Sequence, residues 1–524
     1  MHAFAPSRAP ARATAAAAIA CMIALVSAGC AGPAGAPSPA TPSPPATWRD
    51  WHAGDAPLAL PDVELTVSAP ASTAERWAAF GDPLLARLID QAVAASPDLQ
   101  LAMLRVLEAR ASETTVSAQH GPQVGARGGV ERERLSEIGS ATRLINVIGG
   151  SGPFDKQALI AALAQPFDVW QAGFDASWEL DLWGRVRHAE ELARAQTDEQ
   201  RALLQQARLT LSAEIARGYL ELRATQRQRM EVQAQAASGR ETERLLDAQR
   251  RGGLADETLL LRQQAANTDL DARVLALRAQ EAATLNRLAL LCGQRPGALD
   301  TMLAATDAPP LALPPLAPGL PSDLVRHRPD VAAAEARLAQ ATAGVGIATA
   351  DLYPRITLGA SFGTEALHTG DVADWGSRQW SVGPAISLPI FDHGRRRATV
   401  GLRTLQQREA ATAWQQVVLR AWHEVDDALA AYQADRLALA SAQEKSHRAD
   451  DTLSLARARE AGGLTDGLPT LDAERGAAEA RRQVAEFEGR LATRLVAVYK
   501  ALGNDGSLAS NSDDAPATAD VSAR

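Results

Sequence analysis

The chain contains two copies of one long unit, and this duplication restricts its fold more than any other feature of the sequence. Residues 170–185 recur 210 positions later at 380–395, with Trp, Gly and a final Gly-Arg in matching places. Residues 97–99, Pro-Asp-Leu, recur 232 positions later as Pro-Asp-Val at 329–331. The difference of 22 residues between the two spacings falls in the first copy. A unit this long predicts one pseudo-symmetric body made of two equivalent halves, not an array of small solenoid repeats.

The N-terminal residues are typical of a secretory signal. Two arginines are the only charged side chains before an apolar run at 15–28, which is too short to span a membrane as a helix. The run ends Leu-Val-Ser-Ala-Gly-Cys, which resembles the lipobox of bacterial lipoproteins, although Ser27 stands where an aliphatic residue is usual. Residues 1–29 are therefore expected to be a lipoprotein signal peptide, with lipid attached to Cys30. Ordinary signal cleavage near Ala28 is the alternative.

Both ends of the mature chain have compositions that build no core. Residues 30–70 begin with a run of Ala, Pro, Ser, Thr and Gly and are expected to be a lipid-anchored tether. Residues 504–524, rich in Ser, Asp and Ala, are expected to be a disordered tail. Once the signal is removed and Cys30 carries lipid, Cys292 is the one cysteine left, so no internal disulfide is expected. Its counterpart in the second copy is Leu502, which favours a buried apolar role.

Each copy holds one very long run of helix-forming residues. After Gly184-Arg185 the first copy has no proline and little glycine until Gly252. About 66 residues of this composition would make a helix of roughly 100 Å. Small or apolar residues recur three and four apart within it, the spacing of a heptad seam. The seam comprises Leu204, Ala207, Leu211, Ile215, Gly218 and Leu222, repeated as Trp414, Val417, Ala421, Val425, Ala428 and Tyr432. A second helix is expected to return along 255–292 and along 468–502, so each copy is a helical hairpin.

Before each long helix the alternation of apolar and polar residues changes to a period of two. The apolar positions are Val124, Ala126, Gly128 and Val130, then Phe174, Ala176, Trp178, Leu180 and Leu182, then Ile356, Leu358, Ala360 and Phe362, and finally Val382, Pro384, Ile386, Leu388 and Ile390. They predict four strands of about ten residues, with the length and two-faced pattern of outer-membrane barrel strands. Four strands cannot enclose a lumen, so a barrel would have to be shared between chains. A soluble, half-exposed sheet is the alternative.

The duplication also sets the expected domain boundaries. The first repeat covers 75–293, and the second covers 322–503. Residues 305–321 contain six prolines, so residues 294–321 are expected to form a strap between the repeats. The extra residues of the first copy are expected to form a longer loop at about 136–165.

Five motifs in a fixed order resemble those of the outer-membrane factor family. They are Trp-Ala-Ala-Phe-Gly-Asp-Pro-Leu at 77–84, Trp-Glu-Leu-Asp-Leu-Trp-Gly-Arg at 178–185, Leu-Pro-Ser-Asp-Leu at 320–324, Arg-Pro-Asp-Val at 328–331 and Leu-Pro-Ile-Phe-Asp-His-Gly at 388–394. These are the TolC-like efflux channels, and the NodT/OprM-like lipoprotein branch is the most similar. The likeness runs from about Trp77 to Gly503.

The resemblance implies a mainly α chain with a transmembrane β-barrel. Three chains would form a homotrimer with one 12-stranded β-barrel and a long, coiled-coil-like α-helical periplasmic barrel, each chain contributing two internal repeats. The assembly would be anchored in outer-membrane lipid and extend into the periplasm. Its implied partners are a periplasmic membrane-fusion adaptor and an inner-membrane pump of the RND type.

The hairpin turns are the candidate docking sites, because in the family the corresponding turns face the adaptor. Glycines there can supply the positive φ angles of a tight reversal between helices, and neighbouring charges could bind a partner. A plain capped turn with solvated charges is the alternative. The candidate docking residues are Arg250, Arg251, Gly252, Gly253, Arg459, Glu460, Gly462 and Gly463.

Two aspartates near the second turn are candidates for the channel gate. Asp472 lies in Leu-Asp-Ala, which resembles the Val-Leu-Asp-Ala run of the family, and Asp466 lies just before it. Threefold symmetry would repeat each carboxylate as a ring that favours cations. Pro469 departs from the family pattern and is expected to make the helix begin later.

No motif supports an enzyme. The nine histidines include no HExxH spacing, no Gly-rich phosphate loop joins a strand to a helix, and no cofactor or metal is expected. The balance of 53 Lys and Arg against 62 Asp and Glu, without a basic aromatic stretch, argues against nucleic acid as a partner. The predicted function is passive conduction of small molecules (drugs, toxic compounds or metals) from a tripartite efflux pump to the exterior. A channel for type I protein secretion and a pore-less periplasmic coiled-coil lipoprotein are the alternatives.

Overall fold

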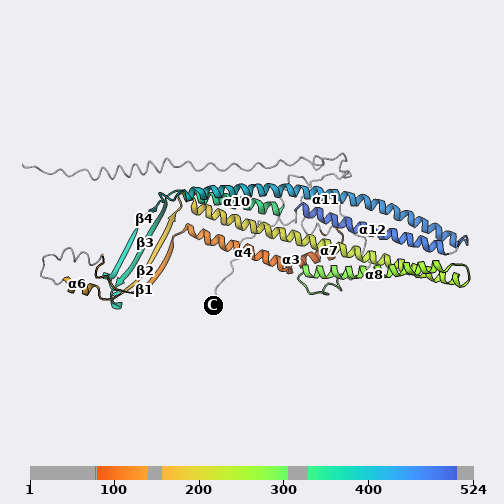
Figure 1. The fold of residues 1–524 in the computed structure, drawn as a ribbon, viewed down its shortest axis with the longest axis horizontal. Helices are drawn as coiled ribbons and strands as arrows, with labels where there is room; N and C mark the ends of the chain where they lie inside the picture. Colours follow the sequence, from red (N-terminus) through yellow and green to blue (C-terminus); the bar gives the residue numbers. More distant parts are fainter. Residues whose placement is uncertain (1–76, 78–79, 140–155, 305–327, 466, 504–524) are drawn as a thin grey trace, which may run out of the picture. The chain divides into compact units, whose positions relative to one another are not determined.

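The structure is a computed structural model, and it describes residues 77, 80–139, 156–304, 328–465 and 467–503 (Figure 1). The expected signal peptide, lipid-attachment site, tether and C-terminal tail lie outside these residues. Helices predominate in the described part, and four strands form one sheet. None of the described helices has the length and apolar character that would let it cross a membrane.

Two helices of equal length confirm the predicted long helical runs. Helix α7 (Arg185–Arg251) and helix α11 (Arg395–Ala461) each contain 67 residues. Both begin directly after a left-handed glycine, Gly184 with φ of 78° and Gly394 with φ of 81°. The carboxylate of Asp181 accepts two backbone N–H groups in the first turn of α7, at 3.1 and 2.9 Å. These contacts satisfy donors that an uncapped helix would leave without partners.

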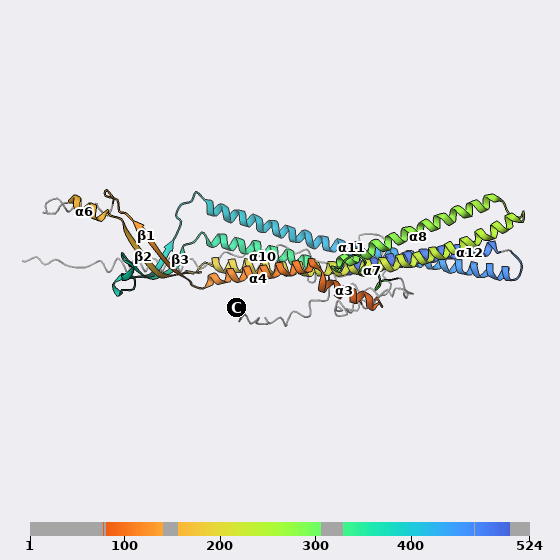
Figure 2. The same cartoon turned by 90° about the horizontal axis from the view of Figure 1, so that it is seen from below.

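Five shorter helices pack beside the two long ones. Helix α8 (Glu257–Leu291) follows α7, and helix α12 (Leu468–Ala501) follows α11, so that each pair is a hairpin (Figure 2). Helices α3 (Pro83–Ala95) and α4 (Pro97–Ser117) pack on α7. Helix α10 (Pro329–Ala350) packs on both α7 and α11, and α12 also packs on both. Helix α7 therefore joins the two hairpins.

The heptad seams predicted from the sequence are the apolar core of this helical part. Of the twelve seam residues, nine are buried and Ala207, Val417 and Ala428 are half-buried. Ile215 and Val425, which occupy equivalent places in the two copies, are both fully buried. Cys292 is buried as well, and burial raises the pKa of its thiol to about 11. The expectation that this cysteine is a small apolar core residue is confirmed.

The four strands form one antiparallel sheet in chain order. They are β1 (Gln123–Glu133), β2 (Phe167–Leu180), β3 (Arg355–Ala366) and β4 (Arg378–Ser387). The register of β1 on β2 is the register of β3 on β4. Val124 is the partner of Ala176, and the residues 232 and 210 positions later, Ile356 and Ile386, are partners too.

Two strands end earlier than the sequence alternation indicates. Leu182 lies beyond β2, and Leu388 and Ile390 lie beyond β4. The chain leaves the sheet at these points because Asp181 is already engaged in capping α7 and because Pro389 has no N–H for the strand ladder. The alternation continues past the strands, so it could not reveal where they end.

Short elements occupy the connections. The 3-10 turn η2 (Ala118–His120) joins α4 to β1, and η3 (Thr369–Asp371) and η4 (Trp375–Ser377) lie between β3 and β4. The longer loop of the first copy contains helix α6 (Lys156–Leu163), which the sequence analysis did not predict. Residues 140–155 of that loop lie outside the described residues.

Buried polar groups of α7 hold the segments that precede α3 and follow α8. Tyr219 donates its hydroxyl proton to Asp82, and Arg223 donates to the Tyr219 oxygen at 3.0 Å. Burial and the hydrogen bond to Asp82 raise the pKa of Tyr219 to about 12. Gln226 donates to the carbonyl of Leu303 at 2.9 Å. Residues 294–304, the part of the expected strap that the structure describes, are therefore held on α7 through Leu303.

Arg328 performs the corresponding task in the second copy. Its buried guanidinium contacts the carboxylate of Asp330 at 2.7 Å and that of Glu424, on α11, at 2.6 Å. It also donates to the carbonyl of Ala501, at the end of α12, at 2.7 Å. One arginine thus joins the start of α10, the middle of α11 and the end of α12, which explains its place in the Arg-Pro-Asp-Val motif.

Candidate functional site

The sheet has one polar face lined with small residues. A cross-strand row runs from Gly125 through Asp175 and Ser361 to Ser381, one residue on each strand. The hydroxyls of Ser361 and Ser381 lie 2.8 Å apart. In a neighbouring part of the same face, Glu365 accepts hydrogen bonds from glutamines on β2 and β4 at 3.2 and 3.4 Å. Water can contact this face of the sheet across all four strands.

The opposite face of the sheet is apolar and exposed. The adjacent cross-strand row contains Phe174, Phe362 and Trp380, which are 60%, 53% and 70% exposed. Val124 and Val382, in the next row, are 70% and 65% exposed. No described helix packs extensively on this sheet. A contiguous exposed apolar face of this kind is typical of a surface that meets a membrane or a partner.

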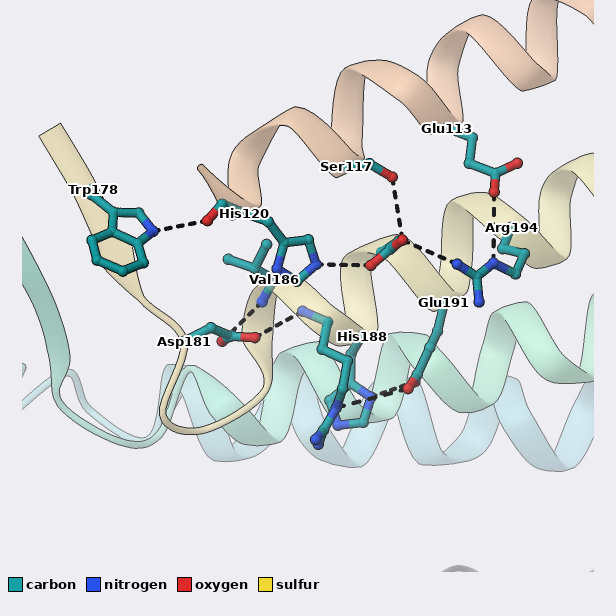
Figure 3. Close-up of polar contacts among 11 residues, drawn as sticks. Glu113, Ser117, His120, Trp178, Asp181, Val186, His188, Glu191 and Arg194 are labelled. Carbon is teal, nitrogen blue, oxygen red and sulfur yellow. Dashed lines mark hydrogen bonds and ion pairs between the residues drawn. The ribbon is translucent and has the colours of Figure 1, made fainter. Parts of the chain in front are cut away.

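Polar side chains fasten the sheet to the helices at their junction (Figure 3). The Nε2 atom of His120 lies 2.8 Å from the carboxylate of Glu190, which also accepts from Ser117 at 3.3 Å and from Arg194 at 3.1 Å. The backbone carbonyl of His120, the last residue of η2, accepts a hydrogen bond from the indole N–H of Trp178 at 2.8 Å. Strand β2 and helices α4 and α7 are therefore joined through one turn.

The hairpin turns reverse the chain through the glycines predicted for them. Gly253 has φ of 75° and Gly463 has φ of 67°, whereas Gly252 and Gly462 keep negative φ angles. In the first turn, the N–H groups of residues 253 and 254 bind the carbonyls of residues 250 and 249 at 3.0 and 2.8 Å. The second turn repeats both bonds at 2.9 Å. Each turn is a Schellman motif, which satisfies the last carbonyls of the long helix.

The charges of the two turns differ in their surroundings. In the first turn, Arg250 and Arg251 both contact Asp247, at 3.1 and 2.7 Å. Hydrogen bonding from Arg250, helped by the charge of Arg251, lowers the pKa of Asp247. In the second turn, Arg459 and Glu460 are exposed and make no ion pair with any described residue.

Both turns also expose a leucine that the sequence analysis did not select as a site residue. Leu254 is 83% exposed and Leu464 is 74% exposed. Each follows the left-handed glycine of its turn. An apolar side chain at this position usually packs on the preceding helix. Leu254 and Leu464 are instead exposed, and a partner could therefore bind them.

One of the two gate candidates can be placed in the structure. Asp472 lies in the first turns of α12, its side chain is 79% exposed, and it contacts Arg475 at 3.1 Å. Asp466 lies outside the described residues. Pro469 occupies the first turn of α12, where a missing N–H leaves no bond unmade. The helix begins at Leu468, one position later than its counterpart in α8, as a proline here was expected to cause.

Polar contacts between the two hairpins, close to Asp472, were not predicted from the sequence. Glu474 of α12 accepts from Ser238 of α7 at 3.3 Å and from Arg457 of α11 at 2.8 Å. Farther along, Gln235 of α7 donates to Glu479 of α12 at 3.4 Å. The two contacts with α7 join residues 236 and 244 positions apart, so no local pattern could have identified them.

Comparison with known proteins identifies the class. The family described as outer membrane efflux protein matches residues 88–294 and 320–504. The chain is 31% identical over 461 residues to the pyoverdine export outer membrane protein OpmQ of Pseudomonas putida, covering 88% of this chain and 92% of OpmQ. It is 32% identical to the outer membrane protein OprJ of Pseudomonas aeruginosa, covering 82% and 85%. The outer-membrane channel OprN superposes with a TM-score of 0.72 at 30% identity, covering 90% of this chain and 99% of OprN.

The chain therefore belongs to the outer membrane efflux protein family, as its five motifs indicated. The family consists of outer-membrane efflux channels, which are transporters and not enzymes. This protein is accordingly an outer-membrane component of an efflux system. The helices, the single sheet and the two hairpin turns are the parts of the chain from which such a channel is built.

Proposed function

We propose that three copies of this chain form one channel, with a 12-stranded barrel in the outer membrane and a helical barrel in the periplasm. The observation that carries the proposal is the two-faced sheet. Its apolar face suits lipid, and its polar face of Gly, Ser, Asp and Gln suits a water-filled lumen. Among the described residues, strands β1 and β4 each have a neighbouring strand on one side only. Pairing of β1 with β4 of the next copy would close the sheet and remove both edges.

The channel conducts small molecules (drugs, toxic compounds or metals) passively from an inner-membrane pump of the RND type to the exterior. The helical hairpins carry the conduit across the periplasm, and their turns bind a membrane-fusion adaptor. The exposed leucines support this assignment, as do the charges of the second turn, which make no ion pair with any described residue. Lipid on Cys30 anchors the chain in the outer membrane, although that residue lies outside the described part. The two sequence copies act as structural repeats, so that three chains supply six equivalent units.

The gate lies at the periplasmic end, where three copies of Asp472 form a ring of carboxylates. Its exposure and its position beside the second turn support this role. Glu474, which contacts both α7 and α11, holds the two hairpins together next to that ring. Opening of the entrance requires these contacts to rearrange.

Purification from outer-membrane fractions and recording in planar bilayers test the proposal. We expect trimers whose mobility changes on heating, and discrete single-channel conductance. Monomers that conduct nothing would contradict the trimeric channel and favour a pore-less lipoprotein.

A crosslink from the turns tests the partner assignment. Gly253 or Gly463 is replaced by cysteine and modified with a photoreactive crosslinker in intact cells, and the captured protein is identified. Capture of an adaptor encoded with an RND pump is the expected result. Capture of an adaptor that serves a protein-secreting ABC transporter would favour type I protein secretion.

A further inference from the structure

One arginine of the sheet has no partner for its charge. Arg378, the first residue of β4, makes no side-chain hydrogen bond or ion pair with any described residue, and its Nη1 atom is shielded from solvent. The ring of Trp375, in η4, covers one face of the guanidinium, with its centre 3.3 Å from Cζ. Stacking leaves the N–H donors, which lie in the plane of the guanidinium, without acceptors. A shielded charged donor of this kind is unfavourable until a ligand supplies an acceptor.

Arg378 lies on the apolar face of the sheet, at the end away from the long helices. It precedes Trp380 by two residues, so the two side chains are on the same face. Strand β4 leads from Arg378 toward α11, whereas η3 and η4 connect β3 to its other end. In the proposed channel this end of the sheet reaches the outer leaflet of the membrane. A cationic side chain on the lipid face here is at the level of lipid headgroups.

An apolar hollow lies on the same face, next to Trp380. Its volume is about 390 Å³. The large apolar residues that line it are Val124, Phe174, Phe362, Trp380 and Val382. Apolar walls favour a hydrocarbon chain over water. The face therefore offers a place for an acyl chain directly beside a cation that lacks an anion.

We propose that Arg378, Trp375 and the apolar hollow bind lipid A, the acylated and phosphorylated sugar that anchors lipopolysaccharide. A phosphate accepts hydrogen bonds from Arg378, and an acyl chain occupies the hollow. A guanidinium suits phosphate because its planar fork can donate two parallel hydrogen bonds. The inference rests on the proposed membrane channel and adds to it a specific lipid of the outer leaflet.

The position of Trp375 favours lipid A over a glycerophospholipid. Its side chain is 75% exposed, on the loop just beyond the end of the strand. The wide sugar headgroup of lipid A can cover this ring while its phosphate meets Arg378. The small headgroup of a glycerophospholipid would satisfy the arginine and leave the ring in water.

The first copy of the repeat lacks this site. Its counterpart of Arg378, 210 positions earlier, is Asp168 on β2. Arg132 of β1 is the cross-strand partner of Asp168, and their charged groups lie 3.5 Å apart. Both belong to the apolar face, because Asp168 precedes Phe174 by an even number of residues. A cation that already has a carboxylate partner attracts phosphate less, so Arg132 is a matched control for Arg378.

The first experiment measures the lipid that stays with the protein. The full chain is extracted from outer membranes in mild detergent and washed, and lipid A is quantified by mass spectrometry. We expect wild type and Arg132→Gln to retain lipid A, and Arg378→Gln to retain severalfold less. Equal amounts in wild-type and Arg378→Gln trimers would overturn the site and leave the channel intact. Wild-type protein that forms no trimers in outer membranes would overturn the channel itself.

A titration of washed wild-type trimers identifies the lipid without relying on a variant that assembles normally. The probes are lipid A, lipid A without its phosphates, and phosphatidylglycerol, and native mass spectrometry counts the bound molecules. We expect lipid A to bind severalfold more tightly than either of the others. Phosphatidylglycerol binding as tightly as lipid A would overturn the assignment to lipid A. Equal binding after removal of the phosphates would overturn the phosphate contact.

The same titration on variants tests the chemistry of the arginine. Arg378→Lys keeps the positive charge but loses the planar fork and its stacking on Trp375. We expect this variant to keep only part of the preference for phosphorylated lipid A, and Arg378→Gln to lose it. A full preference in Arg378→Gln would overturn the role of this residue.

Discussion

At the scale of single residues, ion pairs between α11 and α12 stabilise the second hairpin far from its turn. Asp435 of α11 is buried, and it contacts Arg490 and Arg494 of α12 at 2.5 and 3.0 Å. Burial alone would raise the pKa of this carboxyl. The hydrogen bonds and charges of the two arginines outweigh burial and lower its pKa. A lowered pKa means that the folded state favours the ionised form.

The pH dependence of this pair follows from that direction. Its stabilisation is complete above the unfolded pKa of about 4 and is lost as pH falls through the lower folded value. We expect Asp435→Asn to cost about 2 kcal/mol at neutral pH and to weaken the acid dependence of unfolding. Denaturant unfolding of the purified protein between neutral and acid pH measures both effects. Asp427→Asn, an exposed site on the same helix, is the control, and an equal loss there would contradict the role of Asp435.

The gate is also a matter of single residues. Removal of the proposed carboxylate ring by Asp472→Ala should raise single-channel conductance and weaken block by multivalent cations, because the narrow lumen then loses the three carboxylates that bind a plugging cation. Arg475→Ala, which frees Asp472 from its contact at 3.1 Å, should strengthen the block. Bilayer recordings with and without a trivalent cation compare the variants. Unchanged conductance and block in Asp472→Ala would remove this residue from the gate.

At the scale of elements, the two hairpins use the same reversal at places 210 residues apart. One glycine of each turn adopts positive φ, and the glycine before it does not. The sequence shows two Gly-Gly pairs but does not show which member takes the left-handed conformation. The hydrogen-bond pattern assigns it to the second member in both turns.

This assignment can be tested by two neighbouring substitutions. Gly253→Ala should destabilise the turn by about 1–2 kcal/mol, because a Cβ is strained in the left-handed region. Gly252→Ala, at a negative φ with no backbone atom closer than 3.4 Å to the added Cβ, should be nearly neutral. Hydrogen exchange at the turn measures the local stability. Gly463 and Gly462 provide a second, matched pair, and equal effects within a pair would contradict the assignment.

At the scale of the whole molecule, the alternating faces of the sheet decide which surface meets lipid. Adjacent residues of β3 point to opposite faces, so neighbours in sequence should respond differently to the same charge. Phe362 lies on the apolar face and is 53% exposed, and Ser361 lies on the polar face. This contrast separates a membrane sheet from a soluble one.

We therefore expect Phe362→Arg to reduce insertion, at a cost of about 2–4 kcal/mol near the bilayer midplane. Ser361→Arg should insert normally and change ion selectivity, because its side chain faces the lumen. The amount of trimer in outer-membrane fractions and the reversal potential in bilayers are the two readouts. Equal insertion of both variants would contradict the lipid-facing assignment.

The sequence by itself determined the two helical hairpins, the four strands and the correspondence between the two copies. Heptad spacing identified the long helices and their buried seams, a period of two identified the strands, and the spacings of 210 and 232 residues matched one half to the other. These signals are readable because backbone periodicity is a local property. The ends of the strands were less predictable, because capping by Asp181 competes with continued alternation.

Only the tertiary structure decided which side chains meet. The sequence offers Arg250 and Arg251 as docking charges, but both contact Asp247. It offers no sign that Glu474 joins the hairpins or that the guanidinium of Arg378 has no hydrogen-bond partner among the described residues. The physical reason is that the partner of a polar group, and the cover of an apolar one, depend on residues far away in the chain. Local pattern specifies helices and strands, and packing between them specifies the surfaces on which a channel depends.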